Sequence, residues 1–80
     1  MTLQNRQATR RPTNKAGVIH ADGKDYTVVL RDASSVGARL RLLRSVELPE
    51  RFRFSAPLEK IDADCHVVWR RGNDIGVKFE

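Results

Sequence analysis

The sequence predicts an all-β fold, a small closed barrel of six antiparallel strands, from three observations. Apolar and polar residues alternate in six short runs, with the period of two that a half-buried strand requires. The links between these runs are short and rich in turn-forming residues. No apolar pattern continues at helical spacing for three turns. A barrel has no open strand edge, which favours it over an open sheet in a chain of 80 residues.

The first two strands are predicted to form a tight hairpin. The run at residues 15–20 is followed by Asp22-Gly23 and then by the run at residues 25–31. Asp and Gly both tolerate the positive φ angles that a two-residue turn needs. Alternation in the second run places Tyr26, Val28 and Leu30 on one face, which we expect to point into the barrel.

Four further runs, at residues 38–43, 51–55, 62–70 and 75–80, complete the predicted set. The links include a turn cluster at residues 32–37 and a segment at residues 45–50, the one place where a single helical turn is expected. Strict alternation groups Trp69 with Cys65 and Val67, so its ring is expected in the core; the alternative is a ring near the barrel mouth that stacks on a base. The predicted interior residues are Val18, Tyr26, Val28, Leu30, Leu40, Leu42, Phe52, Phe54, Cys65, Val67, Ile75, Val77 and Phe79.

The net charge of +5 is concentrated near the N-terminus. Residues 1–15 contain four bases, Arg6, Arg10, Arg11 and Lys15, and no acid, whereas the remainder is nearly neutral. We therefore expect a flexible arginine-rich arm at residues 1–14 and a single domain at residues 15–80. A local cluster of guanidinium groups suits a compact anion better than a long nucleic acid, which usually meets a broad basic face. A solubilising tail is the alternative interpretation.

Several kinds of chemistry find no pattern in the sequence. The single cysteine excludes an internal disulfide, and the two histidines have no metal-ligand spacing. No glycine-rich phosphate loop is present, and no motif places a histidine as a base for Ser34 or Ser35. Asp62 and Asp64 share a strand face and are expected to be solvated. We therefore expect no enzyme activity, no metal and no cofactor.

No stretch is long and apolar enough for a transmembrane span, and the N-terminus lacks the apolar run of a signal peptide. These features favour a cytoplasmic protein with no membrane insertion.

Three motifs occur in a fixed order along the chain. Arg6-x-x-x-Arg10 comes first, Asp32-x-Ser34-x-x-Gly37 follows, and the run VVWRRGNDIGVKF closes the chain at residues 67–79. Together they resemble the PilZ domain, a bacterial six-stranded β-barrel that binds the second messenger cyclic di-GMP, often as a stacked dimer. The resemblance extends over almost the whole chain. Many PilZ domains continue into a C-terminal helix, whereas here no long C-terminal helix is expected.

The resemblance implies a set of cyclic di-GMP ligands. They are Arg6, Arg10, Arg11, Asp32, Ser34 and Gly37, with Trp69 as a weaker candidate. An arginine fork matches the O6 and N7 acceptors of guanine and pairs with phosphate. Asp32 would accept from guanine N–H groups, Ser34 would offer a hydroxyl, and Gly37 would allow positive φ or close approach. The structural alternative is that Asp32 and Ser34 cap the turn and that Gly37 begins a strand.

Three functions remain open at this point. The first is a cyclic di-GMP receptor whose arm orders over the nucleotide and signals to an unidentified downstream protein. The second is a PilZ-like interaction module that binds no nucleotide. The third is a small basic barrel for single-stranded nucleic acid, which the five aromatic residues, most of them expected in the core, make the weakest of the three.

Overall fold

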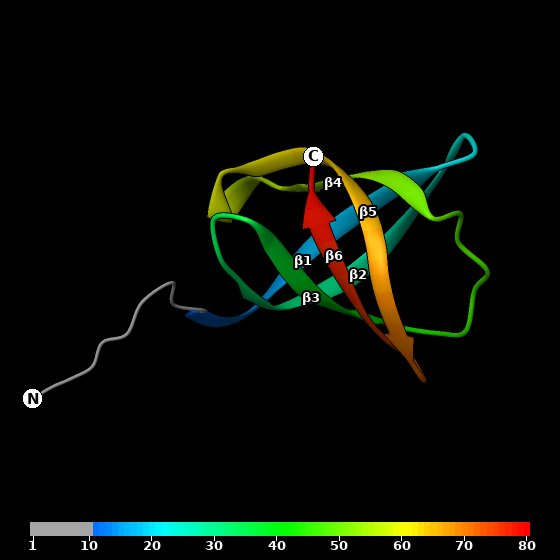
Figure 1. The fold of residues 1–80 in the computed structure, drawn as a ribbon, viewed down its shortest axis with the longest axis horizontal. Helices are drawn as coiled ribbons and strands as arrows, with labels where there is room; N and C mark the ends of the chain where they lie inside the picture. The colour runs from blue at the N-terminus through cyan, green and yellow to red at the C-terminus, as the bar shows by residue number, and fades with distance from the viewer. Residues whose placement is uncertain (1–10) are drawn as a thin grey trace, which may run out of the picture.

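A computed structural model describes residues 11–80 of the chain, and the side chains of residues 14–80. The six strands are β1 (Arg11–Ala21), β2 (Lys24–Ala33), β3 (Gly37–Leu42), β4 (Arg51–Ala56), β5 (Ile61–Arg71) and β6 (Asp74–Phe79). All neighbours pair antiparallel, and the sheet closes in the order β1-β2-β3-β6-β5-β4 (Figure 1). The predicted six-stranded closed barrel is therefore confirmed.

The predicted hairpin at Asp22-Gly23 joins β1 to β2. Both residues have positive φ, 53° for Asp22 and 75° for Gly23, as the two-residue turn requires. The first strand begins earlier than expected, because Arg11 and Pro12 already pair with Ala33 and Asp32 of β2. The flexible arm expected at residues 1–14 lies mostly outside the described residues and stays a prediction.

The expected helical turn at residues 45–50 is wrong, because that segment is irregular. A single 3₁₀ turn occurs instead at η1 (Pro57–Glu59). Pro57 fixes a helical φ where no N–H is needed, and the backbone N–H of Lys60 donates to the Pro57 carbonyl at 3.0 Å. Among the described residues, no helix is long and apolar enough to span a membrane.

The core follows the predicted alternation except in β1 and at Trp69 of β5, which is exposed. In β1 the prediction is wrong, because Ile19 is fully buried and Val18 is only partly so. Both residues suit a strand, so alternation alone did not choose between them. The choice follows from Gly17, on the same inner face: a Cβ there would come within 2.6 Å of the Phe54 ring. Tyr26, Val67 and Phe79 pack against the core but are only partly buried.

The barrel has two different ends. At one end, the turn between β2 and β3 lies beside the last strand, with the Phe79 N–H donating to the Val36 carbonyl at 2.8 Å. We call this the motif end. The opposite, loop end carries the β1–β2 hairpin, the β5–β6 hairpin and the irregular segment 43–50 (Figure 1). There the Leu42 N–H donates to the Asn73 carbonyl at 2.7 Å.

Candidate functional site

Asp32 reaches the outer surface of the barrel through a β-bulge. Strict alternation from Leu30 would point Asp32 into the core, but the register shifts between these two residues. Asp32 therefore pairs with Arg39, which faces outward from β3, and Ala33 pairs with Ala38. A bulge commonly redirects a side chain in this way beside a functional site. Asp32 is nevertheless 7% exposed, and its Oδ2 lies 2.7 Å from Arg39 Nη2.

The turn between β2 and β3 is held by Ser34. Its backbone N–H donates to the Gly37 carbonyl at 2.8 Å, and its Oγ accepts from the Val36 N–H at 3.3 Å. Gly37 begins β3 and is not among the residues with positive φ. Of the roles considered for this glycine, positive φ does not apply, and it begins a strand as the structural alternative had it. Glycine is required there because a Cβ would collide with the Val77 carbonyl of β6.

Trp69 lies on the outside of the barrel, so the expected buried ring is wrong. The register of β5 shifts between Val67 and Trp69, and this second bulge turns Trp69 away from the core. The residue is 42% exposed and pairs with Gly76 of β6. A Cβ at Gly76 would overlap the indole ring, so the ring lies directly against this glycine.

The two bulges bring Asp32 and Trp69 to one hollow of about 350 Å³. It is lined by Asp32, Ala38, Arg39, Val68, Trp69, Gly76 and Val77. A second hollow of about 300 Å³ shares Arg39 and Trp69 with the first and adds Arg70, Arg71 and Asp74. We call this outer surface of β2, β3, β6 and β5 the bulged face. Ser34 and Gly37 do not line either hollow; they form the adjoining turn.

The predicted arginines can be placed only in part. Arg6 and Arg10 lie outside the described residues, and the backbone of Arg11 pairs with Ala33 in β1. Pro12 pairs with Asp32, so the chain enters the barrel beside this carboxylate.

Arg39 is a site residue that the motif did not reveal. It pairs across the sheet with Asp32 on one side and Gly76 on the other, and it lines both hollows. Because Arg39 alternates with the inward Leu40, the sequence predicted that its side chain points outward. The sequence did not predict that Asp32 is its partner, because that pairing depends on the bulge in β2. Arg41, two residues along β3, makes a bidentate pair with Asp74 at 3.0 Å and lines neither hollow.

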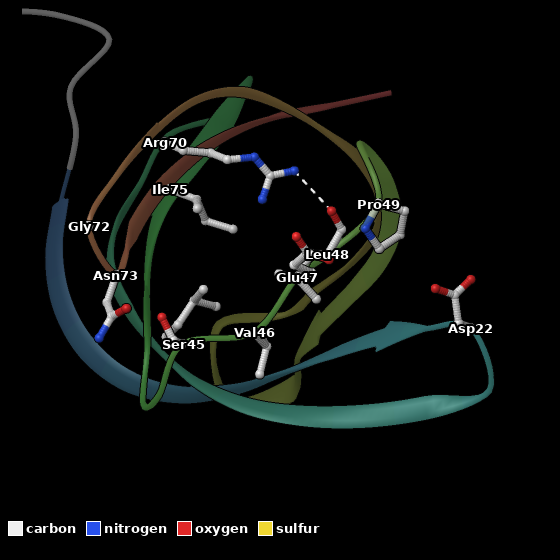
Figure 2. A pocket seen from close by; sticks show the side chains of 11 residues that line it. Asp22, Ser45, Val46, Glu47, Leu48, Pro49, Arg70, Gly72, Asn73 and Ile75 are labelled. Carbon is white, nitrogen blue, oxygen red and sulfur yellow. Dashed lines mark hydrogen bonds between the residues drawn. The ribbon is translucent and has the colours of Figure 1, made fainter.

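A larger hollow, of about 650 Å³, lies at the loop end, and none of the predicted ligands Asp32, Ser34, Gly37 and Trp69 lines it (Figure 2). The side chain of Arg70 crosses it and donates from Nη2 to the Leu48 carbonyl at 3.0 Å. Its lining mixes the apolar side chains of Leu42, Val46 and Ile75 with the acids Asp22 and Glu47. Asp32, Arg39 and Trp69 line the smaller hollow on the bulged face. The size of a hollow therefore does not identify the candidate site.

A small closed barrel that presents a carboxylate, an indole and several guanidinium groups on one outer face belongs to the class of binding domains. Comparison with protein families identifies the class further. The family model of the PilZ domain matches residues 4–80, and the chain belongs to the PilZ family. Comparison with curated proteins gives no match. Membership identifies a binding or adaptor module of the kind associated with cyclic di-GMP.

Proposed function

We propose that this protein is a cyclic di-GMP receptor that uses the bulged face and signals to a downstream protein. One observation carries the proposal: Asp32, Arg39 and Trp69 line a single hollow beside the strand that leads to Arg10. The order of the three sequence motifs supports it. A compact dianion with two guanine bases matches this combination of an acceptor, an aromatic plane and arginine forks.

Each group on the bulged face has a part in this proposal. The exposed indole of Trp69 stacks on a guanine, as aromatic rings do in many nucleotide sites. Asp32 accepts from guanine N–H groups, so its pair with Arg39 must open or be shared. Arg39 then turns its fork to guanine O6 and N7 or to a phosphate. The turn held by Ser34 keeps Asp32 next to the entry of the chain.

The arm supplies the rest of the site in this proposal. Arg6 and Arg10 close over the nucleotide, and Arg11 contributes charge where β1 begins; their side chains lie outside the description, so these roles stay predictions. An arm that orders on binding creates a new surface, which a partner protein recognises in the cytoplasm. Ordering the arm costs free energy and so lowers the affinity for the nucleotide, but it also makes the shape of the protein depend on whether the nucleotide is bound.

The test is a calorimetric titration with cyclic di-GMP at physiological salt, with GTP and cyclic AMP as controls. We expect saturable binding that is selective for cyclic di-GMP, and its stoichiometry separates one nucleotide from a stacked pair. Asp32→Asn and Arg10→Ala should each weaken binding by about tenfold or more, since a bidentate contact contributes about 1–3 kcal/mol. Asp62→Asn is the matched control, because Asp62 is an exposed carboxylate paired with Arg53 instead.

A second function is favoured by the contacts of the motif residues themselves. Asp32 is paired with Arg39, and Ser34 is satisfied within its own turn. These contacts also fit an adaptor that binds a protein and no nucleotide. An NMR spectrum that does not change at saturating cyclic di-GMP would favour the adaptor and contradict the receptor.

A further inference from the structure

A serine, a histidine and an aspartate form a hydrogen-bonded chain on the outer surface of β4, β1 and β2. Ser55 Oγ lies 2.9 Å from His20 Nε2, and His20 Nδ1 lies 2.8 Å from Asp25 Oδ1. None of the three lines a hollow of the bulged face. We call this surface, with the neighbouring Arg53, the regular face, because the register is continuous where its residues pair; the one shift of the β1–β2 ladder lies between Pro12 and Lys15, away from them.

The strand register explains why these residues meet. His20 stands directly opposite Asp25 in the β1–β2 ladder and opposite Arg53 in the β1–β4 ladder. Ser55 lies two residues beyond Arg53 on the same face of β4, diagonal to His20. The β1–β2 ladder is regular from Lys15 to Ala21 and the β1–β4 ladder from Val18 to His20, so the three side chains project from one side of the sheet.

One proton arrangement satisfies both hydrogen bonds when the ring of His20 is neutral. An ionised carboxylate can only accept, so Nδ1 of His20 donates to Asp25. In the neutral ring Nε2 is then an acceptor, and the hydroxyl of Ser55 donates to it. This is the arrangement in which a histidine removes the proton of an attacking serine while an aspartate holds the ring in position.

Arg53 carries a positive charge two residues before Ser55 on β4. Its Nε donates to Asp62 at 2.9 Å, and Asp62 stands opposite Ser55 in the β4–β5 ladder. Its Nη1 donates to Asp64 at 3.2 Å, so two carboxylates of β5 hold this guanidinium. Asp62 and Asp64 together raise the pKa of Arg53, so the group stays charged.

We propose that Ser55 is a nucleophile that accepts an acyl group from small activated acyl donors, with His20 as general base and Asp25 as its positioning residue. Oγ forms a bond to the carbonyl carbon, and the bond from that carbon to the leaving group breaks. The proton passes from Oγ to Nε2 and then to the leaving group or to water. The face is open, with His20 side-chain exposure of 42%, so small donors reach it. The product is a covalently acylated Ser55.

The test uses p-nitrophenyl acetate with the full-length protein near neutral pH. Release of p-nitrophenolate gives the rate, and mass spectrometry of tryptic peptides locates the acetyl group. Residues 54–60 form one such peptide, in which Ser55 has the only hydroxyl, and residues 45–51 form another, in which Ser45 has the only hydroxyl. We expect acetylation of Ser55 at least about tenfold faster than acetylation of the exposed Ser45, which makes no such chain.

Variants separate a general base from a merely structural histidine. His20→Gln should slow Ser55 acetylation about 100-fold, the usual contribution of a positioned base. Asp25→Asn should slow Ser55 acetylation less than His20→Gln does. Asp25 is 71% exposed, so water can take over part of its hydrogen bonding to His20 in this variant. His66→Gln is the matched control, since His66 also faces a carboxylate, Glu80 at 3.4 Å, but contacts no serine hydroxyl; it should change nothing.

Two results would overturn the proposal. One is acetylation confined to amines, or no faster at Ser55 than at Ser45 in the same molecule. The other is an unchanged Ser55 rate in His20→Gln, which would mean that the histidine only ties three strands together. The comparison of Ser55 with Ser45 is made within the wild-type chain, so it stands even if a variant fails to fold.

Discussion

The bulged face and the regular face belong to the same barrel, but they position their side chains by opposite means. On the bulged face, register shifts after Leu30 and Val67 turn Asp32 and Trp69 outward. On the regular face, the parts of the ladders that are in continuous register align His20, Asp25 and Ser55. A bulge changes where one residue points, whereas a regular ladder decides which distant residues become neighbours. One fold can thus carry two independent groups of reactive or binding side chains.

The largest effect that separates the two faces is expected from Gly76→Ala. The new Cβ would occupy the space of the indole of Trp69, and this exposed ring would have to move away. Because stacking of a base contributes about 1–3 kcal/mol, affinity for cyclic di-GMP should fall by about tenfold or more. Acetylation of Ser55 should not change. Calorimetry and peptide mapping of the same preparation measure both.

Gly23→Ala is the control for this substitution. A Cβ at Gly23 would meet nothing within 4 Å, although the φ of 75° costs roughly 1 kcal/mol of stability for alanine. Its nucleotide affinity should equal that of the wild type. If Gly76→Ala also binds normally, the ring of Trp69 takes no part in recognition.

A slightly smaller effect should distinguish two arginines of one strand. Arg39 and Arg41 both point outward from β3 and both pair with an aspartate, but Arg39 alone lines the hollows with Trp69. Arg39→Ala should weaken cyclic di-GMP binding about tenfold, and Arg41→Ala by less than about twofold. Equal losses in calorimetric affinity would mean that the face attracts the nucleotide through its overall charge, without a specific contact.

Much of the fold could be predicted from the sequence, because alternation and turn chemistry are local. The Asp22-Gly23 turn and the inward positions of Val28 and Leu30 follow directly from neighbouring residues. The bulge before Trp69 could not be predicted in this way. Val67, Val68 and Trp69 all favour strands, so nothing local marks where the alternation breaks.

The sites were predictable to different extents for the same reason. Asp32, Ser34 and Gly37 form a contiguous motif, and their turn is where the motif placed it. Arg39 was missed because its partner depends on a bulge. Ser55 was missed because its hydrogen-bonding partner, His20, is 35 residues away and meets it only through the β1–β4 register.

Between the two faces, the barrel interior holds Cys65, whose chemistry should contrast with that of Ser55. Burial, with the charges of Asp64 and Glu80, raises the pKa of Cys65 from 9.0 to about 11. Near neutral pH the thiol therefore stays protonated and should react with neither an ester nor iodoacetamide until the chain unfolds. Mass spectrometry of alkylated protein, with and without urea, measures this protection. Rapid alkylation without urea would contradict the sealed interior.

The same pKa shift predicts how stability depends on alkaline pH. In the unfolded chain the thiol loses its proton near pH 9, whereas in the barrel it keeps it to about pH 11. Its contribution is therefore complete below about pH 9 and is lost as the pH rises toward 11. The difference in unfolding free energy between wild type and Cys65→Ala should shrink across this window. A constant difference would mean that the folded thiol titrates normally.

The smallest effect concerns the link between the bulged face and the loop end. Arg70 follows Trp69 in β5, and its donation to the Leu48 carbonyl ties segment 43–50 to the barrel (Figure 2). Arg70→Gln should lower the unfolding free energy by about 1 kcal/mol, whereas Arg71→Gln, an exposed neighbour, should stay within about 0.5 kcal/mol. Urea titrations compare the two. Both arginines line the second hollow, so a greater loss of cyclic di-GMP affinity in Arg70→Gln would mean that the loop end and the bulged face are coupled through this side chain.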